Sequence, residues 1–171
     1  MHLPLLVELG FWGTLAADVI GWAVVHAGTG YVAHRLPDRR LENDHWLLRV
    51  RRFEPRAYRA LRVQRWKDRL PEAGALFAGG IDKRRLPTSV ETFVRETRRA
   101  ELAHWWALMA APVFALWNPL SGVVLMVTYG LAVNAPFIVI QRYNRHRAQR
   151  LLARRASTAP TTGSEGLQGD A

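Results

Sequence analysis

The positions of the basic residues constrain the fold of this chain more than any other feature. All 24 Lys and Arg residues lie between Arg35 and Arg155, and none occurs in residues 1–34 or 105–140. The stretches without basic residues are also the most apolar ones. Because a bilayer core about 30 Å thick is crossed by roughly 20 apolar residues in a helix, the pattern predicts a small, all-α integral membrane protein.

The first apolar stretch extends from Leu3 to Ala27 and contains two acids, Glu8 and Asp18. As a helix rising about 1.5 Å per residue it would measure roughly 37 Å, enough to cross a bilayer. An ionisable side chain inside a membrane usually faces protein or water, so we expect Asp18 to point into a helix bundle. A buried helix of a soluble protein is the alternative. No basic residue precedes the stretch, so we expect it to be retained rather than cleaved as a signal peptide.

A second apolar region consists of two consecutive runs, Trp105–Trp117 and Leu120–Ile140, separated by Asn118-Pro119. The shorter run would cover only roughly 20 Å as a helix. We therefore expect a tilted or re-entrant hairpin, which gives two or three transmembrane or re-entrant helices in total. Residues 1–155 form a single membrane-embedded domain in this interpretation, and the small, polar residues 156–171 form a disordered tail.

Two basic blocks, Arg35–Arg99 and Arg142–Arg155, flank the apolar runs. Short basic flanks of membrane helices stay in the cytoplasm, so we predict a multi-pass protein of the cell membrane whose basic segments are cytoplasmic. Arginine interleaved with aromatic residues is typical of helices that lie in the headgroup layer. Pro55 divides the first block into two short amphipathic helices of this interfacial kind. Their apolar residues are Trp46, Leu47, Val50, Phe53, Tyr58, Leu61 and Trp66.

A capping box, Thr88 with Glu91, predicts that a helix begins near Ser89. Further along this helix, Glu101 and His104 lie three residues apart and are therefore neighbours on one face. A carboxylate that orients an imidazole and raises its basicity prepares a general base for a hydroxyl proton. A salt-bridged histidine with a structural role is the alternative of equal weight. The predicted catalytic residues are Glu96, Glu101 and His104.

Polar residues also follow the last apolar run. Asn134, Ile138, Gln141 and Arg145 have helical spacing, so one face carries an amide deep in the apolar run and a guanidinium group at its end. An asparagine in a membrane helix generally bonds to another helix or to a ligand. A bond to another helix would give Asn134 a structural role, which is the alternative to substrate binding. Trp66 between two cations can stack on a sugar or anchor in headgroups. The predicted substrate-binding residues are Asn134, Gln141, Arg142, Asn144, Arg145, Arg65, Trp66 and Lys67.

Several chemistries have no motif in this chain. The sequence contains no cysteine, which excludes disulfides, thiolate metal sites and a cysteine nucleophile. A Gly-x-Ser-x-Gly elbow, a Walker loop, a dinucleotide glycine fingerprint and a zinc-spaced histidine pair are also missing. We therefore expect direct transfer chemistry with no metal and no cofactor. The net charge of +10 suits phosphate backbones, but no reader motif accompanies it, so nucleic acid is not an expected partner.

Five motifs stand in order between about Gly30 and Leu152: Arg35-Leu-Pro-Asp38, Phe53-Glu54, Arg65-Trp-Lys67, Glu96–Trp105 and Asn134–Arg147. In these motifs the chain resembles the glycosyl-4,4'-diaponeurosporenoate acyltransferases, small membrane enzymes of the last step of staphyloxanthin-type carotenoid biosynthesis. The resemblance implies transfer of a fatty acyl group to a sugar hydroxyl of a glycosylated carotenoid acid. A related glycolipid is the alternative acceptor.

Roles for four residues follow from the chemistry of such a transfer. We expect His104 to remove the proton from the sugar hydroxyl while Glu101 steadies the imidazolium. Arg142 and Arg145 would hold the phosphates of the acyl donor or the oxyanion of the reacting carbonyl.

The remaining binding residues would contact the acceptor: Asn134 and Gln141 would bond the sugar or the carbonyl, and Trp66 would stack on the glycosyl ring. An acyl thioester is the expected donor. Membrane lipid, the glycosyl carotenoid or glycolipid and other carotenoid-biosynthesis enzymes are the expected partners. A non-enzymatic membrane scaffold of a carotenoid or glycolipid biosynthetic complex is the alternative function.

Overall fold

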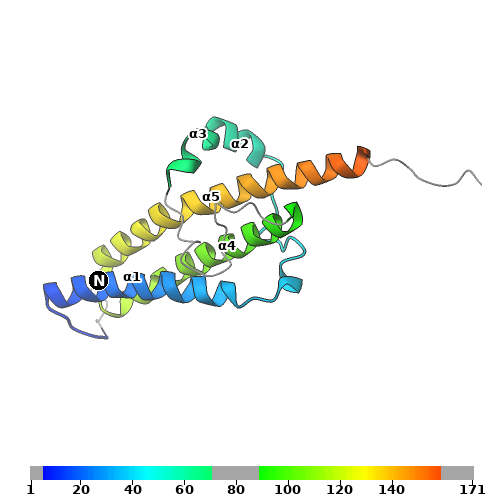
Figure 1. Ribbon diagram of the computed structural model, residues 1–171. Helices are drawn as coiled ribbons and strands as arrows, with labels where there is room; N and C mark the ends of the chain where they lie inside the picture. The colour runs from blue at the N-terminus through cyan, green and yellow to red at the C-terminus, as the bar shows by residue number, and fades with distance from the viewer. Residues whose placement is uncertain (1–5, 71–88, 159–171) are drawn as a thin grey trace, which may run out of the picture.

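The structure is a computed structural model that describes residues 6–70 and 89–158. Every regular element in these two ranges is a helix, which confirms the all-α prediction. Three long helices, α1 (Phe11–His34), α4 (Val90–Ala110) and α5 (Leu120–Thr158), lie side by side, and α4 packs against both of the others (Figure 1). α4 runs antiparallel to α1 and α5, so the basic ends of all three helices gather at one end of the bundle.

α1 begins and ends later than the stretch Leu3–Ala27 predicts. Gly10 is its N-cap and His34 its last residue. Residues 1–5 lie outside the described residues, and the backbone amides of Leu6 and Val7 each donate to the carbonyl oxygen of Leu116, both over 3.1 Å. The start of the apolar stretch therefore crosses the turn between α4 and α5 instead of extending the helix.

Asp18 confirms the prediction that its carboxylate points into the bundle. The side chain is 9% exposed, and Oδ1 accepts hydrogen bonds from Trp117 Nε1 (2.9 Å) and Asn118 Nδ2 (2.7 Å). A buried carboxylate needs such donors because desolvation of an unpaired charge costs several kcal/mol or more. The bonds tie α1 to the turn between the other two long helices.

The predicted hairpin of the second apolar region is present. α4 passes into the 3₁₀ helix η4 (Ala111–Leu116), the chain reverses at Asn118-Pro119, and α5 starts at Leu120. Within the described ranges, α5 is the one helix long and apolar enough to cross a membrane. α5 also continues to Thr158, so residues 156–158 are helical where the sequence predicted a disordered tail, and residues 159–171 lie outside the described residues.

Close packing between α1 and α5 depends on a glycine. Trp22 is 5% exposed and stacks on Phe114 with ring centroids 4.8 Å apart. A Cβ atom at Gly130 would lie only 2.7 Å from Cη2 of Trp22. Gly130 therefore allows α5 to approach α1 at the level of this indole ring, because it has no side chain to collide with it.

The first basic block differs from its prediction. The segment before Pro55 has no α-helix: it contains only η1 (Asp38–Arg40) and turns. In a helix its backbone carbonyl groups would accept hydrogen bonds from the helix's own amides. Here several of them accept hydrogen bonds from arginines of α4 and α5 instead. The second amphipathic piece does form, as α2 (Glu54–Ala60) and α3 (Val63–Trp66), followed by η2 (Lys67–Arg69).

α2 and α3 cover the surface of α5 that is turned away from α4 (Figure 1). Their buried residues Tyr58 and Val63 pack against Ile140, with Trp66 and Tyr143 at the edge of the cluster. Pro55 occupies the first turn of α2, where its missing N–H is not needed. The proline therefore starts a helix here and does not divide two.

Candidate functional site

α4 positions the predicted catalytic residues. Ser89 is its N-cap, and the Ser89 Oγ atom accepts from the backbone amide of Thr92 over 3.1 Å. The predicted helix start is thus confirmed, whereas Thr88, the first residue of the predicted capping box, lies outside the described residues. Thr97 and Glu101, four residues apart on the same face of α4, are both fully buried.

Glu101 is the centre of a buried ion-pair network. Its Oε1 atom accepts hydrogen bonds from Arg142 Nε (2.6 Å) and Trp105 Nε1 (3.0 Å), and its Oε2 atom accepts from Arg145 Nη2 (2.7 Å). Glu101 and Arg145 are both fully buried. Such a pair is compatible with burial because the mutual attraction and the hydrogen bonds offset desolvation.

Arg142 extends this network to α2. Its Nη1 atom donates to Glu54 Oε1 over 2.8 Å, and its Nη2 atom donates to the carbonyl oxygen of Leu47. The hydroxyl of Tyr58 donates to the other carboxylate oxygen of Glu54. Burial, together with this carboxylate, raises the pKa of Tyr58 far above its usual value, so Tyr58 stays a protonated donor.

A third carboxylate, that of Asp44, joins the basic loop between η1 and α2 to α4 and α5. Asp44 accepts from Arg98 Nε (2.7 Å) and from Gln149 Nε2 (3.1 Å), and it lies 3.6 Å from Arg145 Nε. Burial raises the pKa of Asp44, but these hydrogen bonds and the charges of both arginines outweigh it, so the pKa lies below its ordinary value. Asp44 is therefore a carboxylate at neutral pH and fixes the loop in place.

His104 is paired with Asn134, not with Glu101. The Nδ1 atom of His104 lies 3.0 Å from Asn134 Oδ1, and Asn134 Nδ2 donates to the carbonyl oxygen of Gly130 over 2.9 Å. This second bond orients the amide so that its oxygen faces the imidazole. Because an amide oxygen only accepts, Nδ1 carries the proton, and the lone pair of the neutral ring is on Nε2. Phe137 stacks on the imidazole with the ring centroids 4.9 Å apart.

The expected Glu101–His104 dyad does not form, because the carboxylate oxygens bond the guanidinium groups of Arg142 and Arg145 and the indole of Trp105. The same bonds occupy the two arginines that were expected to hold phosphate. Asn134 and Arg145 do share one buried face of α5 with Ile138, as predicted.

The other predicted site residues lie apart from His104. Glu96 pairs with Arg99 on α4 over 3.2 Å. Asn144 is half-buried and makes no side-chain hydrogen bond with the described residues. Arg65, Trp66 and Lys67 lie at α3 and η2, where the indole N–H of Trp66 donates to the Leu61 carbonyl and Lys67 pairs with Asp68.

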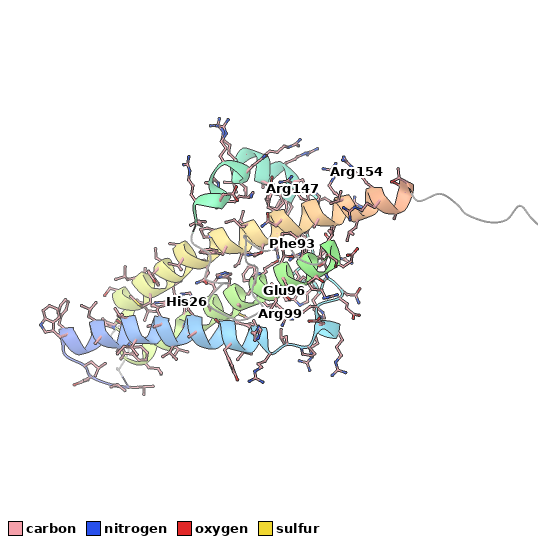
Figure 2. All side chains as sticks on the ribbon, viewed as in Figure 1. His26, Phe93, Glu96, Arg99, Arg147 and Arg154 are labelled. Atoms are coloured by element: carbon pink, nitrogen blue, oxygen red, sulfur yellow. The ribbon has the colours of Figure 1, made fainter. Side chains whose placement is uncertain are left out.

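Two further polar atoms are buried and make no hydrogen bond with the described residues: His26 Nε2 on α1 and Gln141 Oε1 on α5. His26 lies on α1 (Figure 2), where its ring stacks on the indole of Trp22 with the ring centroids 5.4 Å apart. His26 is not among the predicted site residues, although an ionisable side chain within an apolar helix is itself a signal. The site around His104 therefore combines side chains from α4 and α5. The described residues contain no group of three His, Cys, Asp or Glu that could hold a metal ion.

Comparisons with known proteins agree on one relationship. A family model described as glycosyl-4,4'-diaponeurosporenoate acyltransferase matches residues 43–154. Curated proteins of that name from Staphylococcus aureus strains bovine RF122 / ET3-1 and MRSA252 are each 28% identical over 138 residues, covering 77% of this chain and 83% of theirs. The protein of strain N315 is 29% identical over 140 residues. No solved structure matches the chain. The matched region contains His104, Asn134 and the whole Glu101 network.

Proposed function

Because the chain belongs to the glycosyl-4,4'-diaponeurosporenoate acyltransferase family and is thus an acyltransferase, we propose that it acylates a sugar hydroxyl of a glycosylated carotenoid acid or a related glycolipid. The observation that carries this proposal is the oriented imidazole of His104, one residue before the apolar run Trp105–Trp117. A hydrophilic sugar and a lipidic acyl chain can meet at this boundary, and holding both reactants removes much of the entropic barrier.

The proposed mechanism uses His104 as the general base. Its Nε2 atom takes the proton of the sugar hydroxyl, and the sugar oxygen attacks the acyl carbonyl carbon of a thioester donor. The new C–O ester bond forms as the C–S bond breaks, and the leaving thiolate receives the proton from the imidazolium. Asn134 holds the imidazole in the required tautomer, and the polar atoms of His26 and Gln141 are available to bond the sugar.

The Glu101 network has a positioning role in this proposal. It joins α4, α5 and the loop that precedes α2 through Arg142 and Arg145. Since His104 and Asn134 are carried by α4 and α5, the network fixes the separation of the two helices. Glu101 itself would then affect the rate through geometry and not through contact with the substrate.

The proposed setting is the cell membrane. α5 crosses it once, α1 forms a second crossing, and α4 together with η4 forms a third. The basic ends of these helices lie on the cytoplasmic side. Large apolar side chains of α1 that are more than half exposed support this placement: Phe11, Trp12, Val19, Ile20 and Val24. In a membrane these side chains contact lipid, which removes an extensive apolar surface from water.

Mass spectrometry of membrane lipids tests the reaction. Membranes containing a glycosylated carotenoid acid and an acyl thioester should yield, with this protein, a product heavier by one fatty acyl residue and labile to mild alkali. The same membranes with the His104→Gln variant are the matched control. If the glycosyl carotenoid and the other glycolipids keep their masses in the presence of the protein, the proposed acceptor class is wrong.

A further inference from the structure

A basic groove lies between α2–α3 and the C-terminal half of α5. Its volume is about 900 Å³, within the size range of small-ligand sites. The floor contains Tyr58, Val63 and Tyr143, and the walls are cationic. The lining residues that argue for a ligand are Arg59, Arg62, Arg65, His146, Arg147 and Arg150.

The five arginines of this groove differ from the others that the structure places beside carboxylates. Arg98, Arg99, Arg142 and Arg145 each pair with an Asp or Glu. In contrast, the five groove guanidinium groups are exposed, and none has a carboxylate partner among the described residues. Five like charges repel one another around one hollow, so an anion that enters it relieves this repulsion.

The backbone at Arg62 adds an independent observation. Its φ of 49° is the one positive value of a non-glycine residue in the described part of the chain. The left-handed conformation costs free energy for a residue with a Cβ atom, and such residues cluster at ligand sites. Here it separates α2 from α3 at the groove. On the opposite wall, the guanidinium of Arg147 lies over the ring of Tyr143, 5.7 Å from its centroid.

The groove is separate from the His104 site. Tyr143 follows Asn134 by nine residues, which corresponds to about half a turn of net rotation, so the two side chains occupy opposite faces of α5. α4 covers the Asn134 face, and α2 and α3 cover the other (Figure 1). His146 stands six residues beyond Ile140, the end of the apolar run, or roughly 9 Å along the axis. This distance lies at or just outside the headgroup layer of a bilayer whose core ends near Ile140.

We propose that this groove is a second binding site, which takes a ligand bearing phosphate. The guanidinium fork matches phosphate oxygens in a bidentate geometry, and several guanidinium groups around one hollow suit a dianionic or polyanionic group. The headgroup of an anionic phospholipid is the source that the position favours, a step that rests on the membrane placement proposed above. The phosphate preference itself rests on the groove alone.

Two triple variants with the same change in charge test the proposal. The groove variant is Arg62→Gln, Arg65→Gln and Arg147→Gln. The control variant is Arg39→Gln, Arg52→Gln and Arg154→Gln, three exposed arginines outside the groove. In one arm, native mass spectrometry counts the phosphatidylglycerol molecules retained from a mixture with phosphatidylcholine. In the other, calorimetry measures binding of inorganic pyrophosphate to protein in phosphatidylcholine nanodiscs.

The groove variant should bind at least about tenfold more weakly, since each lost charge-assisted hydrogen bond matters several-fold, and the control should stay near the parent protein. Loss in the phosphatidylglycerol arm identifies a lipid ligand, and loss in the pyrophosphate arm alone identifies a soluble one. Equal binding by both variants overturns the proposal. If the groove triple variant does not fold, Arg62→Gln and Arg147→Gln are compared singly with Arg154→Gln. Neither arm measures acyl transfer, so its outcome is independent of the proposed reaction.

Discussion

The carboxylate of Glu101 on α4 lies 2.7 Å from the guanidinium of Arg145 on α5, and both side chains are fully buried. Arg142 shares the same carboxylate over 2.6 Å. Removing one partner of a buried ion pair leaves an uncompensated charge and costs far more than the pair itself contributes. Glu101 is therefore a residue on which the packing of α4 against α5 depends.

We predict that Glu101→Gln lowers the free energy of unfolding by about 3 kcal/mol or more, because two buried guanidinium groups lose their anion. Thermal unfolding followed by circular dichroism in detergent measures the effect. Glu96→Gln is the matched control: Glu96 is half-buried in a single pair with Arg99, and its loss should cost about 1 kcal/mol or less. Equal unfolding temperatures of the two variants would contradict a central role for the Glu101 network.

His104→Gln should lower turnover at least about a hundredfold while the protein still accumulates in the membrane, because glutamine cannot take a proton. Initial rates of acyl transfer with saturating donor measure this. His34→Gln, which changes an exposed histidine at the end of α1, should keep the parent rate. Near-normal turnover of a folded His104→Gln variant would assign His104 a structural role.

The sequence predicts the helices and their buried faces better than it predicts which side chains form hydrogen bonds and ion pairs with one another. Helical spacing places Glu101 beside His104, and the structure does bury Glu101 on the inward face. Spacing says nothing about Arg142 and Arg145, which come from another helix and bind the carboxylate first. Ion pairing between distant segments depends on the tertiary fold. The periodicity of a single helix carries no information about it.

The basic loop shows the same limit. Trp46 and Leu47 have the composition of an interfacial helix, yet their segment forms turns. The carbonyl groups of Leu47 and Leu48 bind Arg142 and Arg145, and this tertiary hydrogen bonding overrides local propensity. Asp18 was predictable for the opposite reason, since a lone carboxylate in an apolar helix has to face polar partners wherever they come from.

Gly130→Ala should destabilise the protein, because the new methyl group would lie 2.7 Å from the indole ring of Trp22. A rigid, stacked ring moves only at the expense of its contact with Phe114, so we expect a loss of about 1–3 kcal/mol. Gly28→Ala in α1 is the control, as its Cβ would meet nothing within 4 Å and alanine favours helix. Thermal unfolding of both variants measures the difference, and equal stability would show that α1 does not pack closely on α5.

Acid should weaken the protein partly through Asp44. Its pKa is lower in the folded protein than the ordinary value of 3.8, so the carboxylate contributes stability that is complete above about pH 5 and is lost as pH falls through the folded pKa. Urea unfolding measured from pH 7 to pH 3 should show this loss. The Asp44→Asn variant should be less stable than the parent protein at pH 7, and this difference should shrink as the pH falls below about 4. A difference that does not change with pH would contradict the assignment.

The orientation of α5 can be tested with single cysteines, because the chain has none of its own. Ser121 and Arg154 are exposed near opposite ends of α5 (Arg154 is labelled in Figure 2). They are 33 residues apart, or roughly 50 Å, more than the full thickness of about 40–45 Å of a bilayer. In intact cells a membrane-impermeant thiol reagent should label Ser121→Cys and leave Arg154→Cys unlabelled until the membrane is permeabilised.

The same reagent tests the other basic block. Arg52→Cys, which lies in that block, should behave as Arg154→Cys does. Labelling of both Ser121→Cys and Arg154→Cys in intact cells would exclude a crossing by α5. Labelling of Arg52→Cys without labelling of Arg154→Cys would place the two basic blocks on opposite sides of the membrane.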